Sequence, residues 1–156
     1  GGPVQGATAL LENIMFTLHP QLAADCFVVG DLPLCRVLLM NDAQYPWLIL
    51  VPRSDAELRE LCELSEEDRL QFSRESDLAA GILNTVFAAE KLNIAALGNM
   101  VPQLHVHHIA RFAADPCWPK PVWGQLPAKA YADSDREERL AALRHAFAAE
   151  PRFISG

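Results

Sequence analysis

The sequence predicts an α+β fold, with about five antiparallel strands in one sheet and helices packed on that sheet. Three short runs rich in β-branched and aromatic residues follow one another closely, at residues 26–29, 35–40 and 45–51. Turn residues close each run, and connections this short favour antiparallel neighbours. A long amphipathic stretch at residues 66–90 then offers one apolar face to cover the sheet.

The expected helices have recognisable starts. Ser54-x-x-Glu57 and Ser65-x-x-Asp68 both fit the capping-box pattern, in which a side-chain hydroxyl accepts a hydrogen bond from a helix amide. The second box opens the helix at 66–90, whose apolar residues recur at helical spacing: Leu78, Ile82, Leu83, Val86 and Phe87. A shorter helix at 7–15 should end before His19-Pro20, because the residue before a proline avoids the helical conformation.

The second half of the chain adds two more strands. Residues 92–97 predict a strand, Gly98-Asn99 a turn, and residues 101–112 another strand. Residues 115–124 hold too many prolines for regular structure. An extra C-terminal helix is expected from Asp133 or Ser134 to Pro151, with an apolar face of Leu140, Leu143 and Phe147.

These signals divide the chain into three parts. Residues 1–25 form an N-terminal extension, residues 26–112 a central domain, and residues 113–156 a loop and helix packed on that domain. A chain of 156 residues is long enough to bury a core of useful size in a single domain.

The charge and cysteine content narrow the classes of partner. The formal net charge is −7 and the 13 lysines and arginines are scattered, so binding to nucleic acid or to an anionic membrane is not expected. The longest apolar runs are too short to span a bilayer. The four cysteines lie far apart without a C-x-x-C pair, which argues against a structural zinc site and favours a reducing, cytoplasmic location.

The segment QLHVHHIAR, at residues 103–111, holds three of the five histidines. Alternate side chains of a strand share a face. Gln103, His105 and His107 should therefore face one way, whereas His108 should face the other, apolar side. We expect His108 to be a hydrogen-bonded structural residue with no catalytic role.

Three interpretations compete for the polar face of this segment. The two histidines are ordinary hydrogen-bonded residues, part of a metal site, or a covalent catalyst. Zinc requires three or four ligands, and no other histidine, cysteine or acid shows a matching spacing. A neutral imidazole can also attack phosphorus to give a phosphoramidate, when neighbouring donors bind the phosphate oxygens. His105, His107, Gln103 and Asn99 supply groups of these types.

Residues 97–111, LGNMVPQLHVHHIAR, resemble the signature of the histidine-triad (HIT) superfamily of nucleotide hydrolases and transferases. That signature is His-φ-His-φ-His-φ-φ, with φ apolar, after a Gly-Gln turn. Asn99 takes the place of the turn Gln, and Gln103, His105 and His107 take the places of the three histidines. The resemblance implies that His105 is the nucleophile at an α-phosphate and that His107 contacts the phosphate or the leaving group. Asn99 and Gln103 would help to bind the phosphate.

A second similarity lies upstream, at residues 37–53. Leu50-Val-Pro-Arg53 matches the apolar-apolar-Pro-basic ending of a pair of strands in the family. The resemblance then places Asn41 where family members bind the ribose hydroxyls. It also implies a HIT-like fold and a homodimer that joins two sheets.

Three positions depart from the family pattern. Gln103 cannot titrate, Asn99 is one methylene shorter than Gln, and Trp47 in place of a histidine is expected to remove a polar group near the site. We therefore expect a nucleotide hydrolase or nucleotidyl transferase, or alternatively a nucleotide-binding regulatory protein without turnover. The enzyme would act on a diadenosine polyphosphate or similar dinucleotide, or on a nucleoside phosphoramidate. It would need no metal cofactor, although the substrate can arrive with Mg²⁺.

Three further side chains lie close to the motif in the sequence. Trp118 and Trp123 either anchor the proline-rich loop to the core or cover the nucleotide site. Arg111 either pairs with a phosphate or, as is more common at the end of a strand, is solvated.

Overall fold

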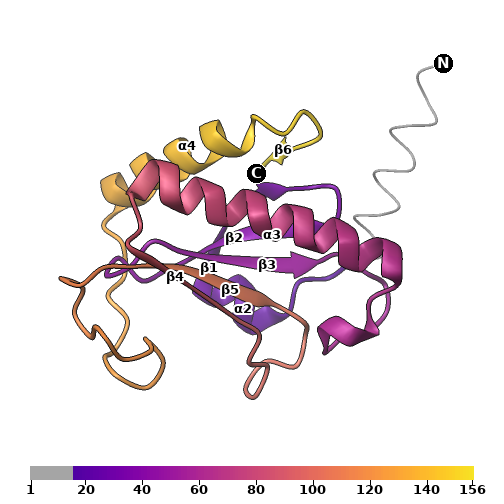
Figure 1. Cartoon of the computed structure of the whole chain (residues 1–156), viewed down its shortest axis with the longest axis horizontal. Coiled ribbons are helices and arrows are strands. Elements are labelled where there is room, and N and C mark those ends of the chain that lie inside the picture. The colour runs from indigo at the N-terminus through magenta and orange to yellow at the C-terminus, as the bar shows by residue number, and fades with distance from the viewer. Residues whose placement is uncertain (1–15) are drawn as a thin grey trace.

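The computed structural model describes residues 16–156, so the helix expected at 7–15 lies outside the described residues. The described chain contains one six-stranded antiparallel sheet in the order β4-β5-β3-β2-β1-β6 (Figure 1). The strands are β1 (Cys26–Asp31), β2 (Cys35–Met40), β3 (Trp47–Pro52), β4 (Lys91–Ala95), β5 (Val106–Arg111) and β6 (Ile154–Ser155). The predicted α+β fold is confirmed, and the short β6 adds a strand at the edge beside β1.

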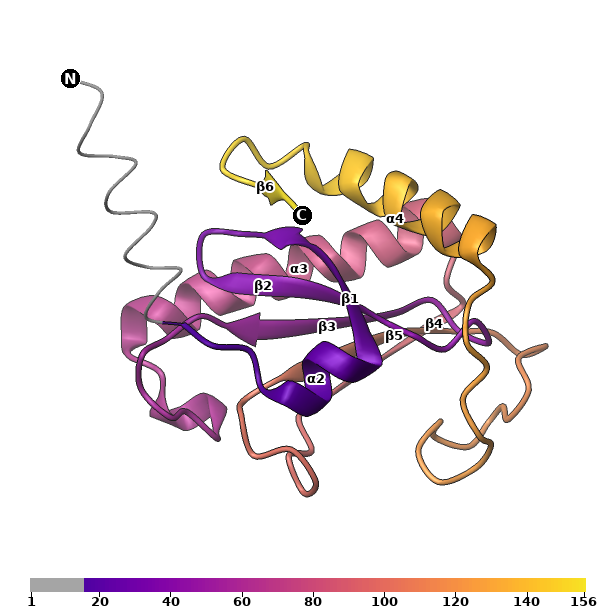
Figure 2. The ribbon, with the colours of Figure 1, turned by 180° about the vertical axis from the view of Figure 1, so that it is seen from behind.

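The two faces of the sheet are covered differently. The long helices α3 (Glu66–Phe87) and α4 (Asp133–Phe147) lie on one face, and the short α2 (Pro20–Asp25) lies on the other (Figure 2). Strand alternation divides the core in the same way. The helix side contains Val37, Leu39, Leu48, Leu50, Leu83, Leu143 and Phe147. The α2 side contains Leu22, Leu38, Trp47, Ile49, Val51 and Ile109.

Helix α3 begins where the sequence predicts. Ser65 is its N-cap, and its Oγ accepts a hydrogen bond from the backbone N–H of Asp68 at 3.2 Å. The helix ends at Phe87 rather than at residue 90, because Ala88 adopts a left-handed conformation with φ 54°. In its middle, the buried Glu75 accepts hydrogen bonds from two backbone amides of the β1–β2 turn, those of Leu34 and Cys35.

Helix α4 also begins as predicted, at Asp133, and buries Leu140, Leu143 and Phe147. It ends at Phe147, four residues before Pro151. No helix within residues 16–156 is long and apolar enough to cross a membrane.

Two expected elements are wrong in part. The Ser54 box starts no α-helix: its Oγ accepts from the Ala56 N–H at 3.1 Å in a local turn, and only the 3₁₀ helix η1 (Leu61–Glu63) follows. The strand expected at 101–112 begins only at Val106. The preceding residues pair elsewhere, since the Leu104 N–H donates to the Leu58 carbonyl at 2.8 Å. Strand alternation therefore does not extend back to Gln103.

Candidate active site

His105 and His107 lie together on the face of the sheet opposite α3. His107 is in β5, and His105 immediately precedes that strand. Their ring centroids are 5.0 Å apart with an interplanar angle of 71°. Each residue is only 7% exposed, so both imidazoles lie in a largely desolvated site.

The ring of His105 is held by the main chain of its own loop. Its Nδ1 lies 2.7 Å from the backbone carbonyl oxygen of Gln103. A carbonyl can only accept, so Nδ1 carries the proton in this contact. In the neutral ring, the lone pair is then on Nε2, the atom that a nucleophilic imidazole uses.

The ring of His107 is held by Trp47, the first residue of β3. The indole Nε1–H of Trp47 donates to Nδ1 of His107 at 3.0 Å, which leaves the proton of the neutral ring on Nε2. Burial, followed by the neighbouring His105 and His108, lowers the pKa of His107 from 6.5 to about 3. The expectation that Trp47 removes a polar group near the site is wrong, because its indole N–H makes the polar contact.

The proline-rich loop supplies one further wall. The Trp123 ring lies edge-on to His107, with centroids 5.2 Å apart, and perpendicular to Trp47 at 6.1 Å. Trp118 is 39% exposed and lies over the guanidinium of Arg111 at 5.6 Å instead. Of the two tryptophans, Trp123 therefore packs against the histidine pair, through His107.

His108 has the structural role that strand alternation predicts. It is fully buried on the helix side, where its Nδ1–H donates to the Val106 carbonyl at 3.1 Å. The Ser76 hydroxyl of α3 then donates to its Nε2 at 2.7 Å. Burial lowers the pKa of His108 to about 4.

The side-chain amide of Gln103 is hydrogen-bonded to the segment before α2, and its predicted phosphate contact stays a prediction. Its Oε1 accepts from the backbone N–H of His19 at 2.8 Å, and its Nε2 donates to the Thr17 carbonyl at 3.0 Å. The sequence gives no signal for these contacts, because the partners lie 84 and 86 residues away.

Asn41 and Asn99 both lie outside the strands, each in a bend of the chain. Asn41 follows β2, and its Oδ1 accepts from the Tyr131 N–H at 2.9 Å. Asn99 is exposed in the turn after Gly98, whose φ of 73° suits glycine. Their predicted roles at the ribose and the phosphate stay predictions. Within residues 16–156, no group of three or more His, Cys, Asp or Glu is placed to hold a metal ion.

Arg111 is neither solvated nor aimed at the histidines. It is 1% exposed and forms a bidentate ion pair with Asp115, with its Nε 2.7 Å from the carboxylate. It also donates to Asn93 Oδ1 of β4 and to the Lys120 carbonyl. Both sequence expectations for Arg111 are wrong: it ties the proline-rich loop, which carries Trp123, to the end of β5.

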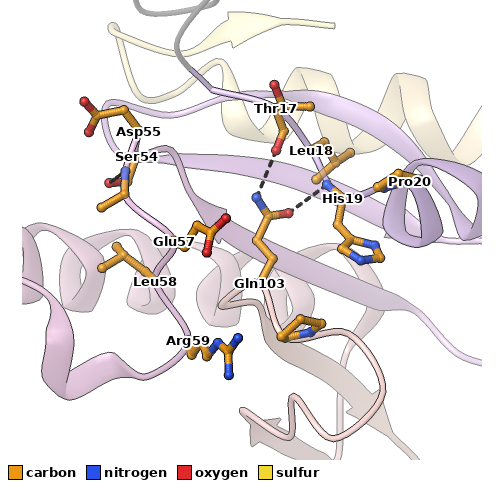
Figure 3. Close-up of a pocket in the computed structure, with 12 residues that line it drawn as sticks. Thr17, Leu18, His19, Pro20, Ser54, Asp55, Glu57, Leu58, Arg59 and Gln103 are labelled. Carbon is orange, nitrogen blue, oxygen red and sulfur yellow. Dashed lines mark hydrogen bonds between the residues drawn. The ribbon is translucent and has the colours of Figure 1, made fainter.

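A cavity of about 490 Å³ is lined by Gln103 but not by His105 or His107. The segment before α2 and the loop at 54–59 wall it, with Pro102 and Gln103 between them (Figure 3). Gln103 is therefore the residue that connects this cavity with the histidine pair.

Comparison with known proteins agrees with the fold. The HIT domain family model matches residues 21–114, more than half of the chain. A histidine triad protein from Marinobacter aquaeolei is 45% identical, with a TM-score of 0.84 over 87% of this chain and 98% of that one.

Two more solved structures are similar to the same degree. Histidine triad proteins from Bradyrhizobium japonicum and Sinorhizobium meliloti are each 44% identical, with TM-scores of 0.81 over 84% of this chain. The matches extend over 97% of the Bradyrhizobium japonicum chain and 96% of the Sinorhizobium meliloti chain. No curated protein sequence matched the chain. The fold is that of these histidine triad proteins, and the chain belongs to the HIT family.

Proposed function

We propose that the protein is a nucleotide-binding hydrolase or nucleotidyl transferase in which His105 attacks an α-phosphate. The substrate class is a dinucleoside polyphosphate, such as a diadenosine polyphosphate, or a nucleoside phosphoramidate. One observation carries the proposal: the Gln103 carbonyl holds the Nδ1–H of His105 at 2.7 Å, so the nucleophilic lone pair is on Nε2. Membership of the HIT family supports the nucleotide as ligand.

The proposed reaction has two substitutions at phosphorus. The Nε2 lone pair of His105 forms a bond to the α-phosphorus while the bond to the leaving group breaks. A polyphosphate departs with the bonding electrons as an anion, and an amine departs after taking a proton from solvent. The adduct ring keeps its Nδ1 proton and is cationic, so it leaves readily when water, or another acceptor, attacks the phosphorus in turn.

His107 would stabilise the charge that develops on the phosphate. Because Trp47 occupies its Nδ1, a neutral His107 presents an Nε2–H donor next to His105. The lowered pKa of His107 keeps this ring neutral at pH 7. We propose Asn99 as a further phosphate donor and Asn41 as a ribose contact through its Nδ2, since its Oδ1 already has a partner. This chemistry requires no resident metal, and Mg²⁺ can accompany a polyphosphate substrate.

The proposed partner is a second copy of the chain. Strand β4 is an edge of the sheet, and three exposed apolar side chains lie on or just after it: Ile94, Leu97 and Met100. An unpaired edge with apolar neighbours favours pairing with a like edge, which would join two sheets. We further propose a cytoplasmic location, which the four free cysteines support.

Trapping the covalent intermediate tests the proposed function. Wild-type protein mixed with labelled diadenosine polyphosphate or adenosine phosphoramidate should carry label that acid releases and base does not, as expected for a phosphorus–nitrogen bond. His105→Ala should carry none. His145→Ala, which changes an exposed histidine of α4, is the matched control and should be labelled like wild type.

Other outcomes assign the site differently. Label that persists in His105→Ala would remove His105 as the nucleophile. Tight nucleotide binding by wild type without any label would favour the alternative of a regulatory protein without turnover. Thermal stabilisation measures that binding, since a ligand at 100 times its dissociation constant adds about 2.7 kcal/mol to the folded state.

A further inference from the structure

We propose that Gln103 is a positioning residue, whose side-chain amide fastens the segment before α2 to the loop that orients His105. We call residues 16–19 the N-terminal arm and residues 101–105 the histidine loop. We call the hydrogen bonds of this amide to the arm the clamp. The effect of the clamp on catalysis rests on the proposed function, whereas the clamp itself can be tested without it.

The clamp consists of two hydrogen bonds made by one amide group. Gln103 Oε1 accepts from the His19 N–H at 2.8 Å, and Nε2 donates to the Thr17 carbonyl at 3.0 Å (Figure 3). The C=O of one residue and the N–H two residues later lie on the same side of an extended chain, as in a β-ladder. The Gln103 amide therefore makes the two bonds to the arm that one residue of a neighbouring parallel strand would make.

This geometry explains why an amide suits the position. The donor and the acceptor must point in nearly the same direction to reach both backbone groups. The two nitrogens of an imidazole point apart, and a carboxylate has no donor for the Thr17 carbonyl. A histidine at the first position of the motif cannot make both bonds, so Gln103 replaces a titrating side chain with a pH-independent clamp.

The clamp acts on catalysis through the main chain of the same residue. The Gln103 carbonyl accepts the Nδ1–H of His105 at 2.7 Å, so any rotation of this peptide unit moves the nucleophile. The histidine loop lies outside β5, and the structure gives it one other long-range backbone bond, from Leu104 N–H to the Leu58 carbonyl. Among the described residues, the Gln103 side chain therefore supplies the second long-range hydrogen-bonded attachment of this loop, beside the packing of Val101 and Leu104.

Hydrogen exchange tests the clamp without relying on activity. Gln103→Met keeps the volume of the side chain and removes both bonds. We expect the His19 amide to exchange at least tenfold faster than in wild type. Gln71→Met is the matched control, because Gln71 donates only to Glu75 on the helix side. It should leave exchange at His19 unchanged.

Single-turnover kinetics test the consequence for His105. In Gln103→Met, labelling of His105 should slow at least tenfold while the nucleotide dissociation constant stays within twofold of wild type. A slower rate with unchanged binding excludes a contact made to the bound substrate before reaction, and together with faster exchange at His19 it identifies positioning. If labelling slows while exchange at His19 stays as in wild type, Gln103 acts by touching the substrate, and the clamp proposal is overturned.

Gln103→Glu provides a pH-dependent version of the clamp. The ionised carboxylate accepts from the His19 N–H but faces the Thr17 carbonyl without a donor, whereas the protonated acid can make both bonds. In Gln103→Glu, the protection of the His19 amide, corrected for intrinsic exchange, should rise as the carboxyl is protonated. In Gln103→Met, the protection of the same amide should not change in this way. An identical pH profile in both variants would contradict the clamp.

The clamp and the proposed function fail in different ways. If wild type forms no adduct but Gln103→Met loses protection at His19, the clamp stands and the proposed function fails. If wild type forms the adduct and Gln103→Met matches it in labelling rate and in exchange, the clamp is overturned and the proposed function stands.

Discussion

At the scale of single residues, hydrogen bonds to one or two neighbours decide the tautomer of each of the three imidazoles. The Gln103 carbonyl fixes His105, the Trp47 indole fixes His107, and the Ser76 hydroxyl with the Val106 carbonyl fixes His108. Strand alternation in the sequence predicts that His108 is separated from the other two. The partners were not predictable, because Trp47 and Ser76 are 60 and 32 residues away in the sequence.

Trp47→Phe should slow the labelling of His105. Phenylalanine keeps an aromatic ring against His107 and Trp123 but lacks the N–H that holds the His107 proton on Nε2. We expect roughly tenfold slower adduct formation, in line with the loss of one oriented donor. Nitrogen-15 NMR of the His107 ring should show a mixture of tautomers. An unchanged rate with a single tautomer would show that Trp47 only packs.

Buried neutral histidines should make the fold sensitive to acid. The pKa of His108 is about 4 in the folded chain, whereas an exposed histidine in the unfolded chain has a pKa of 6.5. Between pH 4 and pH 6.5 the unfolded chain therefore binds more protons than the folded chain. The free energy of unfolding contributed by His108 is fully present above pH 6.5 and falls as the pH drops towards 4. At pH 5 the loss is roughly 2 kcal/mol.

Urea denaturation at pH 7 and pH 5 measures this loss. His108→Gln removes the titrating group. Between pH 7 and pH 5, wild type should therefore lose roughly 2 kcal/mol more of its free energy of unfolding than His108→Gln loses. Equal losses in the two proteins would show that the pKa of His108 is the same in the folded and the unfolded chain, which would contradict its burial as a neutral ring.

At the scale of elements, the sequence predicts the helix starts and strand bounds that depend on residues close together in the chain. The Ser65 cap, the start of α4 and the bounds of β2 all follow from residues within a few positions. The Ser54 box failed because its hydroxyl satisfied a nearby turn amide instead of a helix amide. The histidine strand was expected to start too early because the Leu104 amide pairs with Leu58, a contact that depends on tertiary structure.

Two Gly→Ala substitutions should change stability in opposite directions. A Cβ at Gly30 would meet the Phe153 ring and the Ile154 carbonyl, so Gly30→Ala should force β6 away from β1 and cost about 1 to 3 kcal/mol. A Cβ at Gly81, in the exposed part of α3, would meet nothing within 4 Å. Gly81→Ala should therefore stabilise the protein by up to about 1 kcal/mol. Thermal denaturation compares them, and a stabilising Gly30→Ala would refute the contact.

At the scale of the whole molecule, the structure places two edges on one sheet, β4 and β6. The β6 strand has only two residues, whereas β4 has half-exposed Ile94 and leads to the exposed Leu97 and Met100. The sequence could not distinguish these edges, since strand order is set by pairings between distant segments.

Ile94→Lys should separate the proposed dimer. A charge at this half-exposed position would face the partner edge and cost desolvation on pairing. Sedimentation should give about twice 17.2 kDa for wild type and a single chain for the variant. Wild type that remains a single chain at micromolar concentration would exclude the dimer.

The attachment site of the covalent intermediate tests the central claim most directly. Wild-type protein is quenched in base during turnover, digested, and sequenced by tandem mass spectrometry over residues 103–111. The account predicts one nucleoside monophosphoryl group, located on His105. A group located on His107, or on a residue outside this segment, would contradict it.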